Sequence, residues 1–340
     1  MRAPHFRSPK RKRAVTAIVA AAMLIVVIGL SLAVGTREID PSTVWDSIFA
    51  YDPTNPDHLI VRDLRMSRTI IGVLAGAALA VAGALMQALT RNPFADPGLL
   101  GINAGAALAV VIGIATGTAT SFSGQVWLAF AGAAVAAVLV YAVDARGNST
   151  GAPVRLALAG VAITALLTSI TYAILTVSQS TLNEYRFWVV GSLSGRQGND
   201  ISVLVVAVAV GLAVGFLAAR SLQAISLGDD AAAALGVRIG LTRFVIIGAV
   251  TLLAGAATAA TGPIVFVGLA VPHVVRALVG ASLPWLLFIS AMGGAILLLA
   301  SDIIGRVIAQ PSEIAVGITT AAIGGLIFAL LSRRMKVVEL

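Results

Sequence analysis

The sequence predicts an all-α protein that crosses a membrane about ten times. Of its 340 residues, 59% are hydrophobic and only 11% are charged, and the mean hydropathy is +0.98. A soluble domain would carry about 25% charged residues. Two further observations support this fold class: the apolar residues fall into long runs, and the basic residues are distributed unevenly around those runs.

The apolar runs define the predicted helices in order. A transmembrane helix needs about 20 mostly apolar residues. Runs of this kind lie at residues 14–35, 68–90, 98–117, 124–143, 156–178, 200–220, 241–261, 263–280, 283–301 and 312–331. The first run, of about 22 residues, is longer than a signal-peptide core, so we predict a retained membrane helix. Residues 14–334 are predicted to form one transmembrane domain, between cytoplasmic segments 1–13 and 335–340.

The basic residues predict which side of the membrane each segment faces. With a cytoplasmic N-terminus, the inner segments hold 16 of the 23 lysines and arginines, whereas the outer segments hold ten of the 15 acidic residues. This agrees with the positive-inside rule. Ten spans also place the C-terminus in the cytoplasm. The net charge of +8 therefore reflects orientation, and we expect no nucleic-acid partner.

A polar segment, "RNPFADP" at residues 91–97, interrupts the apolar pattern between the second and third spans. Pro93 and Pro97 lack a backbone N–H and disfavour helical geometry in the residue before each of them. Asn92 and Asp96 can bond the freed backbone groups, and Asp96 before Pro97 makes a good helix start. These residues predict a capped interhelical turn at the inner surface.

The sequence carries no recognisable catalytic or metal-binding motif. It has no cysteine, and its three histidines are far apart. Its lysines lie outside any GxxxxGK[ST] loop, so we expect no enzymatic activity and no cofactor bound by this chain. The spans are almost free of charge between their ends, and the exceptions, Asp302, Arg306 and Glu313, lie near the outer ends of spans nine and ten. A carrier driven by an ion gradient usually needs charged groups near the middle of the bilayer. The spans of this chain lack charged groups there, so such a carrier is kept only as the alternative function.

Four sequence elements occur in the order typical of one transport family. They are "MQALTRNPFADPGLLGINAGAALA", "SLGDDAAAALGV", "TGPIVFVGLAVPHVVRALVG" and "SDIIGRVIAQPSEIAVGITTAAIGG". Together they resemble the FecCD family of ABC-importer permeases, the vitamin B12 and iron-siderophore type. The chain departs from the family pattern at Phe94, at Asn103-Ala104 and at Gly324-Gly325, positions that affect pathway and packing detail.

An internal repeat is consistent with this resemblance. "LAGAALAVAG" at 74–83 and "LAGAATAATG" at 253–262 match at seven of ten positions. The second span runs inward and the seventh outward, so the pair predicts an inverted repeat of spans two to five and seven to ten. Chance similarity between segments rich in alanine and glycine is the alternative.

The resemblance implies a permease subunit that works with several partners. These are a second permease, identical or paralogous, two cytoplasmic ATPases that bind ATP and magnesium, and an extracytoplasmic binding protein. The location implied is the bacterial cytoplasmic membrane. A ferric siderophore is the predicted cargo, and haem and cobalamin are the alternatives.

The resemblance also assigns an outer docking site for the binding protein. Arg65, Arg68 and Arg306 match arginines that receive glutamates from that protein. Contact with lipid headgroups is the alternative for the first two. An ion pair with Asp302, one helical turn away, is the alternative for Arg306.

On the inner side, residues 228–237 resemble the coupling helix that sits in a groove of the ATPase. Acidic residues favour its N-terminus and a left-handed glycine can end it, but two turns are too short to be stable alone. A capped surface turn is the alternative. The predicted coupling residues are Gly228, Asp229, Asp230, Ala232, Ala233, Leu235 and Gly236.

The family's pathway runs between two permease subunits, largely along spans five and ten. The hydroxyl groups of these spans suit a weakly binding passage, and they also suit ordinary helix packing. The predicted gate and pathway residues are Asn92, Phe94, Thr164, Thr168, Thr319 and Thr320. The positions before Arg155 hold Pro153 and Val154, which leaves a second inner gate unassigned.

Overall fold

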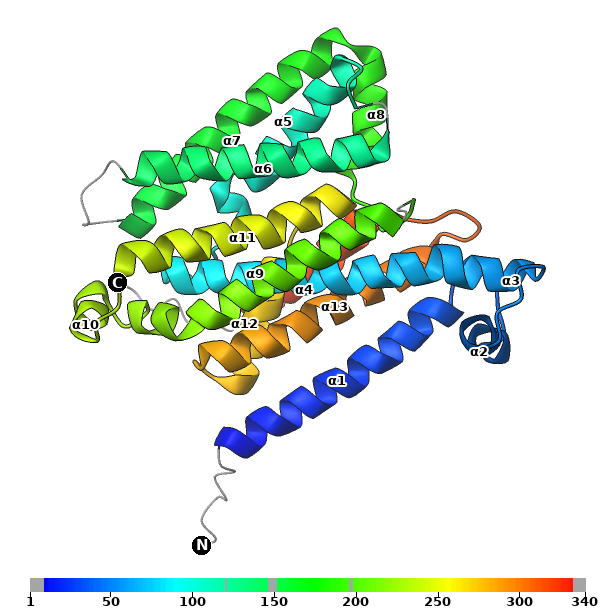
Figure 1. Cartoon of the computed structure of the whole chain (residues 1–340), viewed down its shortest axis with the longest axis horizontal. Coiled ribbons are helices and arrows are strands. Elements are labelled where there is room, and N and C mark those ends of the chain that lie inside the picture. Colours follow the sequence, from blue (N-terminus) through cyan, green and yellow to red (C-terminus); the bar gives the residue numbers. More distant parts are fainter. Residues whose placement is uncertain (1–8, 120, 146–151, 196–197, 333–340) are drawn as a thin grey trace, which may run out of the picture.

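The computed structural model describes residues 9–119, 121–145, 152–195 and 198–332, and these fold into helices without a strand (Figure 1). The first eight residues of the predicted basic tail and the C-terminal segment 335–340 lie outside the described residues. The all-α prediction is therefore confirmed for the part of the chain that the structure describes.

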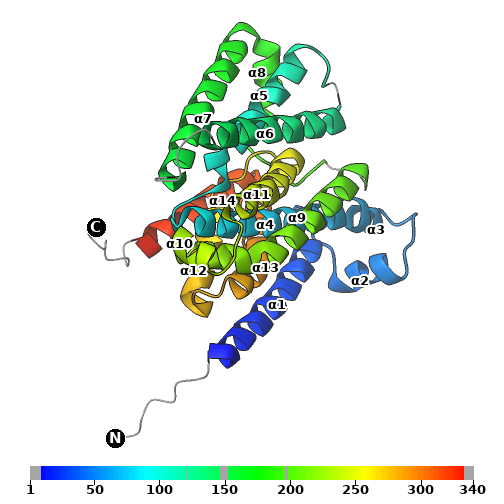
Figure 2. The same cartoon turned by 60° about the vertical axis from the view of Figure 1, so that its left-hand side comes forward.

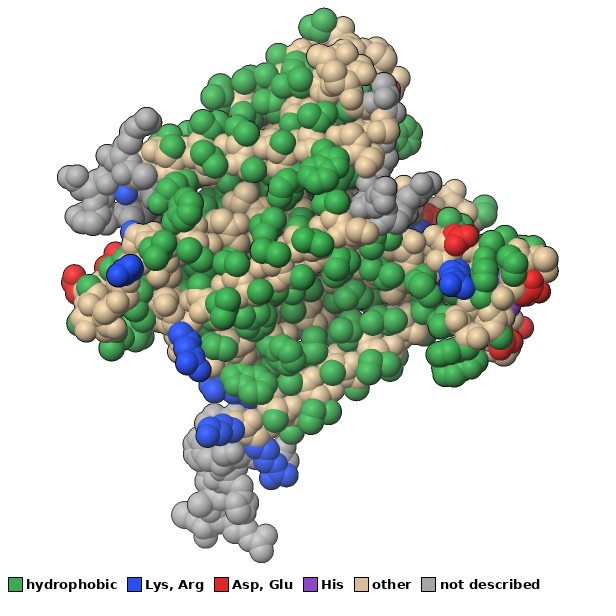
Figure 3. Space-filling view, viewed as in Figure 1, with side chains coloured by type: hydrophobic (Ala, Val, Ile, Leu, Met, Phe, Trp, Pro, Cys, Tyr) green, Lys and Arg blue, Asp and Glu red, His purple; other side chains and the backbone are tan. Residues whose placement is uncertain are grey.

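Every predicted span corresponds to an apolar helix. These are α1 (Pro9–Ala33), α4 (Met66–Thr90), α5 (Ile102–Ala115), α6 (Phe122–Ala145), α7 (Ala152–Val177), α9 (Gly198–Ile225), α11 (Ile239–Thr261), α12 (Val267–Val279), α13 (Leu283–Ile308) and α14 (Val316–Ser332). Among the described residues, seven helices are long and apolar enough to cross a membrane, whereas α5, α12 and α14 are shorter. Figure 3 shows an apolar belt with charged side chains gathered at its two ends.

The search for apolar runs missed the helices that do not cross the membrane. On the outer side, α2 (Pro41–Phe49), α3 (Pro56–Leu59) and the π-helical turn η1 (Ile60–Arg65) precede α4, and α8 (Gln179–Val189) follows α7. The segment of α8, "QSTLNEYRFWV", is too polar and too short to span a bilayer. Proline at the first positions of α2 and α3 supplies the start signal that could have revealed them.

The helices form two groups that lie one above the other in Figures 1 and 2. The upper group consists of α5, α6, α7 and α8. The lower group holds α4 at its centre, packed against α9, α11, α12 and α13, and α1 lies at its edge against α13. Contacts between α11 and α6 join the groups.

Glycine allows α4 to touch its neighbours backbone to backbone. A Cβ atom added at Gly76 would lie 2.4 Å from the carbonyl oxygen of Gly294 on α13, and one at Gly83 would lie 1.9 Å from that of Gly268 on α12. Membrane helices associate through such small residues because lipid offers no hydrophobic driving force. The helices α4 and α11, which carry the repeat segments, also pack together, although the inverted repeat itself stays a prediction.

The prediction for the eighth span started too early. Residues 262–266 are irregular, and α12 begins only at Val267, after Phe266 in a left-handed conformation with φ of 69°. Irregular backbone in a membrane protein is tolerated where protein surrounds it and satisfies its polar groups. The Ser192 N–H accordingly donates to the carbonyl of Thr261 at 2.8 Å. Within this connection Ile264 is buried, whereas Val265 is 43% exposed.

Candidate functional site

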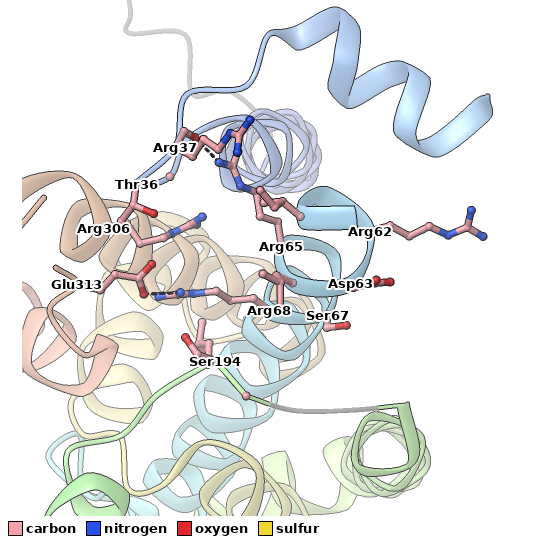
Figure 4. Close-up of a pocket in the computed structure, with 15 residues that line it drawn as sticks. Thr36, Arg37, Arg62, Asp63, Arg65, Ser67, Arg68, Ser194, Arg306 and Glu313 are labelled. Atoms are coloured by element: carbon pink, nitrogen blue, oxygen red, sulfur yellow. Dashed lines mark hydrogen bonds and ion pairs between the residues drawn. The ribbon is translucent and has the colours of Figure 1, made fainter. Parts of the chain in front are cut away.

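A charged pocket of about 710 Å³ opens at the outer end of the molecule (Figure 4). It lies where η1 and the start of α4 meet the end of α13 and the residues that follow α1. Its lining includes Arg37, Arg62, Arg65, Arg68 and Arg306. The structure thus brings together all three arginines that the sequence assigned to docking, and we call this feature the outer arginine pocket.

Asp302 joins two of these arginines from a completely buried position. Its carboxylate receives the Arg68 guanidinium at 2.7 Å and that of Arg306 at 3.0 Å. Arg68 also reaches Glu313 at 2.6 Å, and the Glu313 side chain is 36% exposed. The expected alternative for Arg306, an ion pair with Asp302, is therefore present. A buried carboxylate between two guanidinium groups is satisfied in charge and in hydrogen bonds.

Arg65 and Arg306 also hold the chain segment that follows α1. Arg65 is buried and donates to the backbone carbonyls of Leu32, Ala33 and Arg37, the first at 2.7 Å. Arg306 donates to the carbonyl of Val34 at 2.8 Å. These two guanidinium groups therefore face protein carbonyls in this conformation. The arrangement leaves little room for contact with lipid headgroups.

The docking role stays a prediction. Arg65 and Arg306 are buried, whereas the other arginines of the pocket can be reached from outside. Arg68 meets the pocket's exposed edge through Glu313, so a carboxylate from outside can compete for it. Arg37, with a side chain 59% exposed, and Arg62, which stacks 4.3 Å above the Tyr51 ring, are the accessible arginines that the sequence analysis missed. Arg62 could have been found, because it lies one turn before Arg65.

The polar segment 91–97 forms the predicted turn, which we call the inner elbow. Asn92 accepts the N–H of Phe94 at 2.9 Å, and Asp96 accepts that of Gly98 at 2.8 Å. The predicted helix start at Asp96 and Pro97 is thus confirmed, but the helix is a 3-10 turn, η2 (Pro97–Leu100), and α5 begins only at Ile102.

Phe94 of the inner elbow contacts the last predicted span. Its ring is 49% exposed and meets Phe328 of α14 edge to face, with centroids 5.8 Å apart. Asn92 is also exposed. The gate role of both residues stays a prediction, and no pattern in the sequence pointed to Phe328 as a partner.

The predicted coupling helix is present as α10 (Asp229–Ala234). Gly228 precedes it and Gly236, with φ of 76°, follows it in the predicted left-handed conformation. After its end, the N–H of Val237 donates to the carbonyl of Ala232 at 3.0 Å, and the N–H of Gly236 donates to that of Ala233 at 2.9 Å. This pair of hydrogen bonds is a Schellman motif. The segment therefore has defined helical ends rather than the form of a simple turn.

The side chains of α10 face two environments. Ala232 is completely buried against the rest of the chain, whereas Ala233 is exposed and Leu235 is 67% exposed. Leu227, just before the helix, is 72% exposed. Ala232 therefore packs α10 onto this chain, and the remaining apolar side chains are available to a partner.

The predicted pathway residues do not share one exposed face. Thr164 and Thr168 on α7 are half-buried, and on α14 Thr319 is 7% exposed and Thr320 is fully buried. The pathway role of these residues stays a prediction. In the described structure, Tyr172 of α7 is 64% exposed, and Ser169 and Thr176 of the same helix are also exposed.

Comparisons with known proteins agree with the resemblance noted in the sequence. The sequence model of the FecCD transport family matches residues 23–334. The ferric enterobactin transport system permease protein FepD of Escherichia coli (strain K12) is 43% identical over 312 residues, covering 92% of this chain and 93% of that protein. The Fe(3+)-citrate import system permease protein YfmD of Bacillus subtilis (strain 168) is 40% identical, covering 97% and 98%.

The fold also matches a solved structure. A structure described as an inward-facing conformation of a metal-chelate type ABC transporter superimposes on this chain with a TM-score of 0.82. The match covers 94% of this chain and 99% of the other. The sequence identity is 24%. The likeness confirms the helical architecture and the order of the helices.

Proposed function

This chain belongs to the FecCD transport family, and on that premise we propose that it is the permease subunit of an ATP-driven importer that carries a ferric siderophore. The family match, which extends over nearly all the described residues, carries the proposal. The ferric enterobactin and iron citrate named for FepD and YfmD favour an iron chelate over haem or cobalamin. The importer lies in a bacterial cytoplasmic membrane, which the chain crosses several times.

The cargo passes between this chain and a second permease subunit, identical or paralogous. The unpartnered face of α7 supports this arrangement. Val154, Leu158, Val161 and Leu166 are each more than half exposed, although α7 packs against α5, α6 and α8 on its other side. Covering this face with the same face of a second permease leaves Tyr172 and the hydroxyl groups of α7 close to the axis between them.

Two ATPase subunits bind at the inner surface and supply the energy. The exposed side chains of α10 support this site, because Ala233 and Leu235 form a small apolar surface at the predicted cytoplasmic end. The test uses proteoliposomes that contain the chain, its second permease and its ATPases. We expect uptake to require ATP and to continue when a protonophore collapses the proton gradient. Uptake driven by the gradient without ATP would support the alternative carrier and reject this function.

A negative charge on the exposed side of α10 should uncouple the complex. In Ala233→Glu, the new carboxylate points into the ATPase interface, while the buried packing of Ala232 is unchanged. We expect normal amounts of the chain in the membrane and loss of ATP-dependent uptake, measured in the same proteoliposomes. Ala233→Ser, which is small and uncharged, is the matched control and should transport normally. Full uptake by the glutamate variant would contradict the proposed interface.

A binding protein delivers the cargo to the outer arginine pocket. We expect Arg37→Glu combined with Arg62→Glu to weaken its binding by up to about 30-fold, because each exposed ion pair contributes about 0.2–1 kcal/mol. Binding can be measured on permease in nanodiscs, and added salt should weaken the wild type in the same direction. Arg186 is an exposed arginine of α8 that lies outside the pocket, so Arg186→Glu is the matched control. Equal binding by both variants would place the docking surface elsewhere.

A further inference from the structure

A second cluster of charges lies at the opposite, inner end of the chain. The Asp229 carboxylate, on the first residue of α10, receives Arg243 of α11 at 2.8 Å on one oxygen and Arg91 on the other. Arg91 also donates to the carbonyl of Ile225, the last residue of α9, at 2.6 and 3.0 Å. Asp229 therefore connects α10 to the ends of α4, α9 and α11, and we call these side chains the inner ion-pair cluster.

This cluster restrains a helix whose two connections have open space around them. Gly228 and Gly236 flank α10 with φ of 125° and 76°, and a side chain at either position would meet nothing within 4 Å. Neither connection is therefore held by packing around these glycines. A helix of two turns is also too short to be stable alone. The buried Ala232 and the two ion pairs of Asp229 consequently determine the orientation of α10.

The cluster leads directly to the inner elbow. Arg91 ends α4 in a left-handed conformation with φ of 51°, which is unfavourable for a residue other than glycine. Its neighbours Asn92 and Phe94 follow at once, and Phe94 contacts Phe328 of α14. A shift of α10 that moves Asp229 therefore displaces the guanidinium of Arg91 and, through its constrained backbone, the elbow.

We infer that Asp229 is the positioning residue that transmits movement of the ATPase-bound helix α10 to the inner elbow. The inference rests on the proposed function, because it needs an ATPase at α10. The three side chains are 21–36% exposed, so their ion pairs contribute little to stability. Removing the charge of Asp229 should therefore spare folding and affect coupling.

The test measures cargo transported per ATP hydrolysed in proteoliposomes. In Asp229→Asn, which keeps the size of the side chain, we expect about tenfold less cargo per ATP hydrolysed, within the usual range of coupling between sites. Asp229→Glu should restore most of the ratio because it restores the charge. Arg220→Gln removes an exposed arginine at the inner end of α9, outside the cluster, and should leave the ratio unchanged.

A second readout follows the elbow itself. Because the chain has no cysteine, Asn92→Cys provides a single site for a spin label on the exposed elbow. We expect ATP binding to shift the label's spectrum in the otherwise unchanged chain and to leave it unchanged when Asp229→Asn is added. A shift that persists in Asp229→Asn would overturn the inference.

Two other outcomes are also decisive. If Asp229→Asn lowers the amount of assembled complex to the same extent as it lowers transport, Asp229 is a structural residue and the inference is wrong. If the unmodified complex moves no cargo with ATP, the proposed function fails instead. The wild-type measurement therefore separates the two failures.

Discussion

Asp302→Asn is expected to destabilise the chain by about 3–5 kcal/mol, because it leaves Arg68 and Arg306 beside a neutral side chain in a buried site. Asp302 is completely buried, so water cannot replace the lost carboxylate. Thermal unfolding of the purified chain in nanodiscs would measure the loss, and the yield of folded protein should fall with it.

Glu313→Gln is the matched control for Asp302→Asn. It removes the other acidic partner of Arg68, but this partner is 36% exposed. An exposed ion pair is worth about 0–1 kcal/mol, so this variant should unfold close to the wild-type temperature. If both variants unfold together with the wild type, Asp302 does not hold the outer arginine pocket together.

Gly160→Ala is expected to disrupt the contact between α7 and η2. The added Cβ atom would lie 1.6 Å from the carbonyl oxygen of Leu99 in η2, so backbone must move to admit it. Overpacking typically costs about 1–3 kcal/mol, and we expect the upper end of this range or more because both sides of the contact are backbone. Thermal unfolding in nanodiscs again measures the effect.

Gly248→Ala provides the matched control for Gly160→Ala. Gly248 is also inside a transmembrane helix, α11, but a Cβ atom there would meet nothing within 4 Å. Alanine should be neutral or slightly stabilising because it has the higher helix propensity. Equal stability of the two variants would show that α7 and η2 separate without cost.

The sequence predicted the membrane helices well because each depends on local composition. A run of about 20 apolar residues has few alternatives to a transmembrane helix, and each of the seven described helices long and apolar enough to cross a membrane coincides with a predicted span. The start of α12 was misplaced for the same reason, because residues 263–266 are apolar although the structure leaves them irregular. Polar α8 gave no signal in a search for apolar runs.

The sequence predicted where the candidate site residues lie, but not which of them are buried. Arg65 and Arg306 lie together at the outer end of the chain, yet their burial depends on carbonyls at the end of α1, which no local pattern reveals. Similarly, the sequence could not tell that Ala232 is buried and Ala233 exposed, because four consecutive alanines in α10 have no hydrophobic periodicity. A glutamate at position 232 would therefore test packing rather than docking.

The attachment of α1 also has a consequence for biosynthesis. This helix leaves the ribosome before the other described helices, but the arginine that holds the carbonyl of its Ser31 is Arg306, 275 residues later. The main packing partner of α1, helix α13, also comes late in the chain. In the folded chain, only 11% of the apolar stretch of α1 is buried. During translation, α1 must therefore remain in the bilayer without its final neighbour while most of the other helices insert. The long apolar surface of α1 keeps it stable in the bilayer during this time. The packing of α1 against α13 is therefore one of the last steps of assembly.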